Sequence, residues 1–337
     1  MSRYIIRRTL IAIPTLIAIS FVIFIILDLA PNDPTGSLPL TVPGDVREAI
    51  REALGLNDPF FFRWLKWMRQ MFINEPLNFI ESVFNISIGA GEDRVRIVSW
   101  SSRSPVVDTI IQRIPQTLWV LGTAFILGVI IAVPVGVISA YKQYSAFDNI
   151  GTFVTMVGYS VPTFFTGLLA IIIFSVWLGW FPSFYDTTLE VNSWETFVQQ
   201  VKQMIMPVAV LALFNAAALS RFTRSSMLDN LNEDYVRTAR SKGISENRVL
   251  TRHVLRNSLI PVVTLIALQI PGIFAGAIIT EQIFRVNGLG QLLIISIQGG
   301  DVPMVQTLTF IFAVLIVFFN LIADVTYGLL DPRIRYD

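Results

Sequence analysis

The chain has 337 residues, of which 53% are hydrophobic and only 15% charged, and its mean hydropathy is +0.63. This composition is far more apolar than that of a soluble globular protein and indicates a membrane protein. Cysteine is absent and His253 is the single histidine, which excludes disulfides, thiolate catalysis and multi-histidine zinc sites. A net charge of +1 gives no argument for nucleic acid binding.

Six stretches are long enough to cross about 30 Å of hydrocarbon, which takes roughly 20 apolar residues. They run over about Thr9 to Leu29, Ile114 to Ala140, Ile150 to Trp180, Met204 to Ser220, Leu259 to Thr280 and Val305 to Leu329. The first is too long for the apolar region of a signal peptide, and no small-x-small cleavage site follows before Pro31. We therefore predict an all-α membrane protein with six transmembrane helices, the first of them retained.

An even number of spans places both termini on one side of the membrane. The basic residues near the N-terminus, the segment 221–256 and the C-terminal arginines all fall on that side, which the positive-inside rule identifies as the cytoplasm. We expect four parts. They are residues 1–30 with the first helix, a large extracytoplasmic loop region 31–113, a five-helix core 114–330 that contains the cytoplasmic segment 221–258, and a cytoplasmic tail 331–337.

The extracytoplasmic loop is far longer than a simple connection. Residues 45–54 have helical spacing, with Asp45 as a cap and Gly55 as a stop. A second helix is expected from Asp58 and Pro59, with one apolar face suited to the membrane interface or to a partner. That face would hold Phe61, Trp64, Leu65, Met68 and Phe72. Residues 74–104 show no clear period, and no structure is assigned to them.

The cytoplasmic segment has the pattern of two short helices joined at a glycine. Asn232 is a suitable N-cap for the first helix, and Gly243 fits the left-handed position after its end. Ser245 can begin the second helix, in which Val249 with His253 and Leu250 with Val254 would form i,i+4 pairs. The segment is expected to form a compact knob, with His253 inside the knob or at the socket that receives it.

The sequence of this knob carries a family resemblance. Residues 234–243, DYVRTARSKG, and 252–261, RHVLRNSLIP, resemble the EAA loop of ABC importer permeases in its peptide-permease variant. Ala239 and Gly243 match the family, whereas Arg237 stands where the family has glutamate, so an ion pair of that glutamate with an ATPase does not carry over. Three further segments are similar to family motifs in the same order: Ala30 to Pro34, Thr280 to Gly290, and Leu330 to Tyr336.

The resemblance implies a type I ABC importer permease fold and a multi-pass protein of the plasma (inner) membrane. It also implies the partners: a second homologous permease, two ABC ATPase subunits, an extracytoplasmic substrate-binding protein and membrane lipid. The chain has no GxxxxGK[ST] phosphate loop, so ATP and Mg would be bound by the ATPase partners. It would be no enzyme, with no catalytic, cofactor or metal site. The expected ATPase-docking residues are Tyr235, Arg237, Thr238, Ala239, Lys242 and Gly243.

The resemblance implies di- or oligopeptides as the substrate, with oligosaccharides or nickel as alternatives. Polar positions inside spans are candidates for the translocation pathway: Tyr159, Ser160, Asn215, Gln269, Asn320 and Asp324. The competing interpretation is that Tyr159, Ser160 and Gln269 form helix-to-helix hydrogen bonds. For Asp324 it is a place near the cytoplasmic end, where the side chain snorkels or pairs with a basic residue. Proline and glycine inside the spans are open to two interpretations, tight helix packing and hinges.

Two other classes of protein remain as alternatives. A secondary transporter or channel would use intramembrane charges or inverted repeats, and a membrane enzyme would need a convergent nucleophile and base. The sequence shows no repeat and almost no intramembrane charge. We therefore predict the ABC permease.

Overall fold

The computed structural model describes residues 2–30, 41–86, 94–275 and 277–330, and this part of the chain is helical apart from its connections. It contains no strand, and β-type pairing is limited to an isolated bridge between Val98 and Pro105. Most of the predicted motif at 30–34 and the C-terminal tail 331–337 lie outside the described residues. The chain folds as two compact units, a larger one of residues 1–9, 115–291 and 315–337 and a smaller one of 10–114 and 292–314.

Five helices in the described residues are long and apolar enough to cross a membrane. They are Ile6–Leu29, Val106–Tyr141, Trp194–Leu231, Glu246–Ile273 and Val302–Val325. A sixth span exists only if the helix pair Ala146–Ser160 and Thr163–Trp177, bent by 103°, is taken as one. By length and composition, candidate membrane spans are thus present, and a count of six depends on this broken pair.

The break corrects the predicted continuous span from Ile150 to Trp180. Helix α7 (Ala146–Ser160) ends at Val161, whose backbone is extended, and α8 (Thr163–Ala170) begins after Pro162 and continues as the π-helix η4 (Ile171–Trp177). Proline disfavours the helical conformation of the residue before it and has no N–H for the helix ladder. Pro162 therefore ends one helix and starts the next.

The fourth predicted span is also much longer in the structure. Helix α9 (Trp194–Leu231) has 38 residues and begins with a capping box formed by Ser193 and Thr196. At 1.5 Å per residue it is about 57 Å long, against roughly 30 Å of hydrocarbon. Its ends therefore extend beyond the apolar segment 204–220, which is the part that hydropathy detects.

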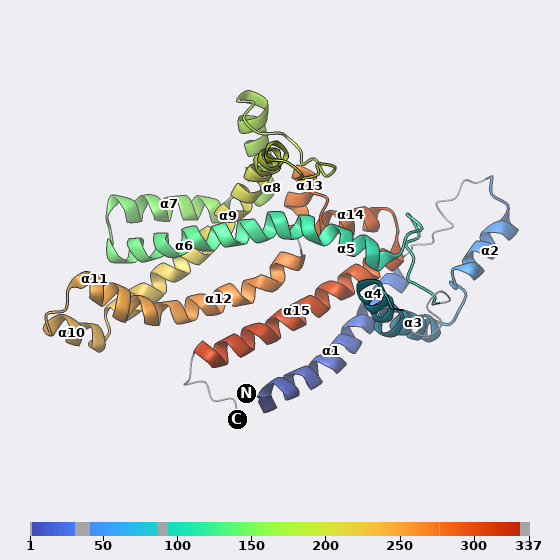
Figure 1. The fold of residues 1–337 in the computed structure, drawn as a ribbon, viewed down its shortest axis with the longest axis horizontal. Coiled ribbons are helices and arrows are strands. Elements are labelled where there is room, and N and C mark those ends of the chain that lie inside the picture. The colour runs from blue at the N-terminus through green and yellow to red at the C-terminus, as the bar shows by residue number, and fades with distance from the viewer. Residues whose placement is uncertain (1, 31–40, 87–93, 276, 331–337) are drawn as a thin grey trace. The chain divides into compact units, whose positions relative to one another are not determined.

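The larger unit is built around a seam between α9 and α6 (Thr123–Tyr141), which contact one another more extensively than any other pair of helices; in Figure 1 α9 passes obliquely behind α6. Small residues recur every four positions on the buried face of α6: Ala124, Gly128, Ala132, Gly136 and Ala140. A Cβ built on Gly136 would lie 2.6 Å from the carbonyl oxygen of Ser220 and 2.6 Å from Cβ of Thr223. Gly136 therefore serves tight packing, as in other membrane bundles with small residues at the interface.

Two further contacts hold helices to α9. Asp148 of α7 is buried and accepts two hydrogen bonds from the guanidinium of Arg224, at 2.8 and 2.9 Å. Helix α12 (Leu255–Ala275) packs Val262 against Ala216 and Leu219 of α9. Helices α6, α7 and α12 thus share α9 as a common support, which fixes the ends of α7 and α12 that line the cavity described below.

In the smaller unit, the loop region after α1 (Ser2–Leu29) folds into helices. They are α2 (Gly44–Ala53), α3 (Phe60–Arg69), the π-helix η1 (Gln70–Asn74) and α4 (Glu75–Phe84). Pro43 and not Asp45 occupies the N-cap of α2, and Gly55 follows its end with φ +68° as expected. Segment 74–104, which had no assigned structure, contains α4 and, over the described residues 94–104, a loop that leads into α5 (Val106–Thr117).

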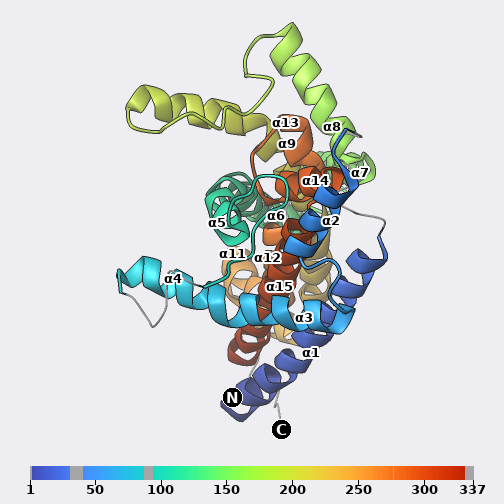
Figure 2. The ribbon, with the colours of Figure 1, turned by 90° about the vertical axis from the view of Figure 1, so that its right-hand side faces the viewer.

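Helix α3 packs across α1, as Figure 2 shows, through Phe60 and Trp64 against Phe21. On its next turn Trp67 packs edge-on against Phe310 of α15 (Val302–Leu330), with ring centroids 5.3 Å apart. The buried face is therefore Trp64 with Trp67, whereas Phe61 and Leu65 are exposed. Trp64 belongs to the predicted face and is buried, whereas Trp67 was not placed on that face, because its partner Phe310 lies far away in the sequence and leaves no local pattern.

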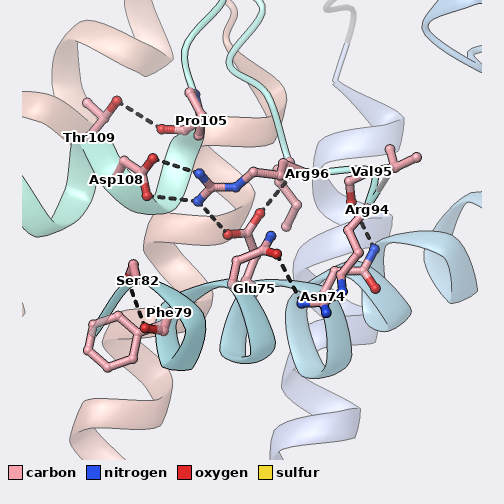
Figure 3. Close-up of polar contacts among 12 residues, drawn as sticks. Asn74, Glu75, Phe79, Ser82, Arg94, Val95, Arg96, Pro105, Asp108 and Thr109 are labelled. Carbon is pink, nitrogen blue, oxygen red and sulfur yellow. Dashed lines mark hydrogen bonds and ion pairs between the residues drawn. The ribbon is translucent and has the colours of Figure 1, made fainter. Parts of the chain in front are cut away.

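An arginine clamp joins α4 to α5 (Figure 3). Arg96 donates to both carboxylate oxygens of Asp108, at 2.7 and 2.8 Å, and to Glu75 at 2.9 Å. Glu75 is 3% exposed, and its other oxygen accepts from the backbone N–H of Ile97. A buried carboxylate is stable only when paired and hydrogen-bonded in this way, so the clamp sets the path of the loop 94–105.

Candidate functional site

A cavity of about 1070 Å³ lies in the larger unit between the α7–α8 break, α9, α12 and the short helix α13 (Ile278–Phe284). Four of the six residues predicted for a pathway line it: Tyr159, Ser160, Asn215 and Gln269. They come from three helices, α7, α9 and α12, and the fold brings them to one space. The sequence did not identify the other lining groups, among them Thr163, Phe214 and Thr280.

The polar side chains of this cavity are available to a ligand. Across the described residues, Tyr159, Ser160, Asn215 and Gln269 form no side-chain hydrogen bond, although each is at least partly accessible. The helix-to-helix hydrogen bonds of the competing interpretation are therefore absent for Tyr159, Ser160 and Gln269 within that part of the chain. Their hydroxyl and amide groups face the cavity with donors and acceptors to offer.

The cavity wall is neutral and partly aromatic. Its lining residues include no Asp, Glu, Lys, Arg or His. Tyr159 at the end of α7 stacks on Phe214 of α9, with ring centroids 5.9 Å apart and planes 7° from parallel. This stack lies next to the break at Pro162, so an aromatic contact ties the broken helix to the central one.

The other two predicted pathway residues lie elsewhere. Asn320 and Asp324 are on α15, and neither lines the cavity. Asp324 accepts a hydrogen bond from Nε of Arg8 at 2.7 Å and is 16% exposed at its side chain. In the structure Asp324 thus pairs with a basic residue, which was the alternative interpretation of this position.

One wall of the cavity is fixed by a buried carboxylate, Glu281, which follows the lining residue Thr280 on α13. Glu281 is fully buried and accepts from the backbone N–H of Gln291 at 2.9 Å and from the hydroxyl of Thr117 at 3.2 Å. The same hydroxyl accepts from the N–H of Leu289 at 2.8 Å. Glu281 and Thr117 together satisfy the free N–H groups that begin α14 (Leu289–Gln298).

The Glu281 arrangement explains the Gly-Leu-Gly of residues 288–290. A Cβ on Gly288 would lie 2.5 Å from both Oε1 of Glu281 and Oγ1 of Thr117, and one on Gly290 would lie 2.9 Å from Cα of Ile278. The glycines are required for space around the carboxylate. Thr117 gave no signal in the sequence, because its partner is 164 positions away.

The second candidate site is the knob, formed by α10 (Asp234–Ser241), α11 (Glu246–Arg248) and the π-helix η5 (Val249–Val254). It lies at one end of α6, α9 and α12 (Figure 1). Val236 and Ala239 of α10 are buried in a cluster with Met227 of α9 and Ala140 of α6. Tyr235 packs against the same cluster and donates to Asn230 at 2.7 Å. Tyr235 and Ala239 therefore attach the knob to the bundle.

The remaining predicted docking residues form the exposed side of the knob. Arg237, Thr238, Lys242 and Gly243 are all exposed. Gly243 has φ +74°, in the left-handed region expected from the sequence, and a Cβ there would meet no atom within 4 Å. Arg240 and Glu246 form a two-bond pair across this bend, at 2.6 and 3.1 Å.

Two local predictions for the knob were wrong. Asn232 closes α9 by donating to the carbonyl of Leu228, and Glu233 occupies the N-cap of α10. The second helix is a π-helix over Val249–Val254, so Val249 and Val254, five positions apart, share the buried face. The predicted i,i+4 pairs assumed the α-helical pitch, which the wider π turn replaces.

The comparison with known protein families decides between the remaining classes. The family described as "Binding-protein-dependent transport system inner membrane component" matches residues 132–336, and its N-terminal counterpart, "Binding-prot-dependent transport system membrane comp, N-term", matches residues 1–121. The chain belongs to this permease family. Both the knob and the larger part of the cavity lining fall within the matched residues.

Similar permeases cover the chain from end to end. The oligopeptide transport system permease protein AppB of Bacillus subtilis (strain 168) is 42% identical over 337 residues, with 100% of both chains covered. The glutathione transport system permease protein GsiC of Escherichia coli (strain K12) is 34% identical over 337 residues, again with 100% of both chains covered. The chain is therefore similar to peptide-type ABC permease subunits over its whole length.

Proposed function

We propose that this permease is the transmembrane subunit of an ATP-driven, binding-protein-dependent importer of di- or oligopeptides, and that the 1070 Å³ cavity is its share of the translocation pathway. The carrying observation is the gathering of Tyr159, Asn215 and Gln269, without internal hydrogen bonds, in one cavity. A conduit needs polar groups that are not already used by the protein. These groups meet that requirement.

The chemistry of the lining favours peptides over nickel. Amide and hydroxyl groups match the N–H and C=O of a peptide backbone whatever its side chains are. Nickel prefers imidazole and other strong ligands, and the lining offers no histidine, carboxylate or thiolate. The names of AppB and GsiC, an oligopeptide and a glutathione permease, support the same substrate class. Oligosaccharides remain the alternative that the transport assay must test.

The proposal includes the partners that the family resemblance implies. A second permease would complete the conduit, two ATPase subunits carrying ATP and Mg would receive the knob, and an extracytoplasmic binding protein would deliver substrate. The exposed side of the knob, with Arg237 and Lys242, is the surface offered to an ATPase. The Arg240–Glu246 ion pair across Gly243 would hold α10 and α11 together. A movement of the ATPase would then move the knob as one rigid body.

Transport by the assembled complex in proteoliposomes tests this function. We expect ATP-dependent uptake of short peptides and no uptake of nickel or oligosaccharide. Asn215→Leu should lower peptide uptake about 2- to 13-fold, as expected for one lost hydrogen bond of roughly 0.5–1.5 kcal/mol. Asn320→Leu, a polar position outside the cavity, is the matched control. Equal uptake by the two variants would show that the cavity is not the pathway.

The topology requires its own test. The proposal places both termini and the knob in the cytoplasm, with six spans when the α7–α8 pair counts as one. Because the chain has no cysteine, single cysteines can be introduced at Glu52 of α2 and Ser241 of α10. An impermeant thiol reagent should label the first from outside the cell and the second only after the membrane is opened. The reverse pattern contradicts the topology.

A further inference from the structure

A second cavity, of about 300 Å³, lies wholly within the smaller unit. Its walls come from the end of α1, the loop after α2, helix α3, the loop 95–103 and the first turns of α15. Neither the permease function nor the family match assigns a role to it. The polar and charged groups that line it include Asp28, Asp58, Arg63, Lys66, Arg96, Arg103 and Gln306.

Two of the lining residues each have a buried nitrogen atom without a hydrogen-bond partner within the described chain. They are Nε2 of Gln306, whose residue is 4% exposed, and Nε of Arg96. An unpaired buried donor is unfavourable, because it has lost its hydrogen bonds to water. A glutamine amide can turn to present its oxygen, but the Nε of arginine only donates. A group with acceptor oxygens in the cavity would supply partners for these donors.

The charges on the lining are compatible with such a group. Arg63 is paired with Asp28 at 2.5 Å, and Arg96 with Asp108 and Glu75, which raise the pKa of Arg96 and keep it cationic. In the described parts of the chain, Lys66 and Arg103 have no ion-pair partner, and Asp58 is the lining carboxylate without one. Two unpaired cations thus stand beside one unpaired carboxylate on the lining.

The apolar side of the cavity indicates which kind of molecule would supply the acceptor oxygen atoms. Phe24 and Leu27 line it, and both belong to the candidate membrane span Ile6–Leu29. They are close to the end of that span, where charged residues such as Asp28 begin. The cavity has cations and hydrogen-bond donors on one side and the end of an apolar span on the other. These two sides match the charged headgroup of a phospholipid and the beginning of its acyl chains.

We infer that this cavity binds the phosphate group of a phospholipid headgroup, with Lys66 and Arg103 as its cationic partners and Arg96 and Gln306 as donors. Lysine and arginine both bind phosphate through charge-assisted hydrogen bonds. The acyl chains of such a lipid would lie against Phe24 and Leu27. A bound lipid would thereby connect α1, α3 and α15. The protein itself joins α3 to α15 through Trp67 and α3 to α1 through Phe60 and Trp64.

Native mass spectrometry of the delipidated, assembled complex tests the inference by titration with three probes. These are phosphatidylglycerol, diacylglycerol with the same acyl chains, and inorganic phosphate. We expect one tight phosphatidylglycerol site whose affinity falls about tenfold in Lys66→Gln, which corresponds to about 1.4 kcal/mol. Lys202→Gln changes an exposed lysine of α9 as the matched control and should bind like the wild type. Diacylglycerol should bind at least tenfold more weakly and be insensitive to Lys66→Gln.

A second variant tests the inference independently of any folding defect in Lys66→Gln. Arg103 is exposed with φ +58°, and Arg103→Asn keeps a residue that tolerates this conformation while removing the charge. It should also weaken phosphatidylglycerol binding several-fold. Equal binding by Lys66→Gln, Arg103→Asn and Lys202→Gln overturns the inference, as does diacylglycerol binding as tight as that of phosphatidylglycerol. Inorganic phosphate that binds as tightly as the lipid would show a free-anion site and overturn it too.

Discussion

Gly136 on the α6–α9 seam and Gly243 in the knob are glycines for opposite physical reasons. At Gly136 the backbone is helical and there is no space, since a Cβ would lie 2.6 Å from the carbonyl oxygen of Ser220. At Gly243 there is space, with no atom within 4 Å of a Cβ, but φ is +74°. The first glycine is needed for packing and the second for a bend. Substitutions should therefore damage folding at one place and coupling at the other.

The largest effect is expected for Gly136→Val. Inserting even one methylene into a packed core costs about 1–3 kcal/mol, and valine adds three carbon atoms against a backbone carbonyl that cannot turn away. The amount of membrane-inserted protein should fall severely, measured by immunoblotting of membranes. Gly122→Val is the control, because Gly122 is helical and a Cβ there meets no atom within 4 Å. Equal amounts of the two variants would contradict the packing role.

Glu281→Gln should give the next largest effect and extends the comparison to a buried polar group. An amide presents one oxygen where the carboxylate presents two, so the start of α14 would lose an acceptor. We expect a loss of about 1–3 kcal/mol, measured as a lower midpoint of thermal unfolding of the purified complex. Glu190→Gln, at an exposed position in the connection between η4 and α9, should leave the midpoint unchanged. An unchanged midpoint in Glu281→Gln would mean that the carboxylate does not hold the cavity wall.

Gly243→Val should leave stability nearly intact and remove function. A left-handed backbone costs a residue with a Cβ roughly 1 kcal/mol, and more when the residue is β-branched. That is small for a packed bundle, but the bend sets the direction of α11. The variant should be abundant in membranes while ATP hydrolysis becomes uncoupled from peptide uptake. Gly243→Asn should stay closer to the wild type, and normal transport by Gly243→Val would refute the coupling role of the knob.

Arg237→Ala should have the smallest effect of the series. Arg237 is 73% exposed and its nearest carboxylate, on Asp234, is 3.5 Å away, a contact of the weak surface type. Abundance and thermal stability should match the wild type, and attachment of the ATPase should weaken less than in Gly243→Val. If ATPase attachment weakened more in Arg237→Ala than in Gly243→Val, the charge of Arg237 and not the bend at Gly243 would be the main determinant of docking.

Several features followed from the sequence because they depend on local chemistry. The apolar segments are present as helices since roughly 20 apolar residues produce the same hydropathy signal wherever they lie. Gly243 and Gly55 have the positive φ that their positions after helices predict. The family could be identified from short motifs. Element limits were less accurate, because polar extensions such as those of α9 carry no hydropathy signal.

Tertiary structure alone decided which residues meet. Tyr159, Asn215 and Gln269 come together at one cavity because α7 breaks before Pro162 and α12 packs on α9. The candidate Asp324 instead pairs with Arg8, and Glu281 finds Thr117 164 positions earlier. Helical periodicity gives the faces of one helix, but the choice of face, as in α3, depends on what the neighbouring helices offer to bury. Long-range partners leave no local pattern, so the fold was needed to find them.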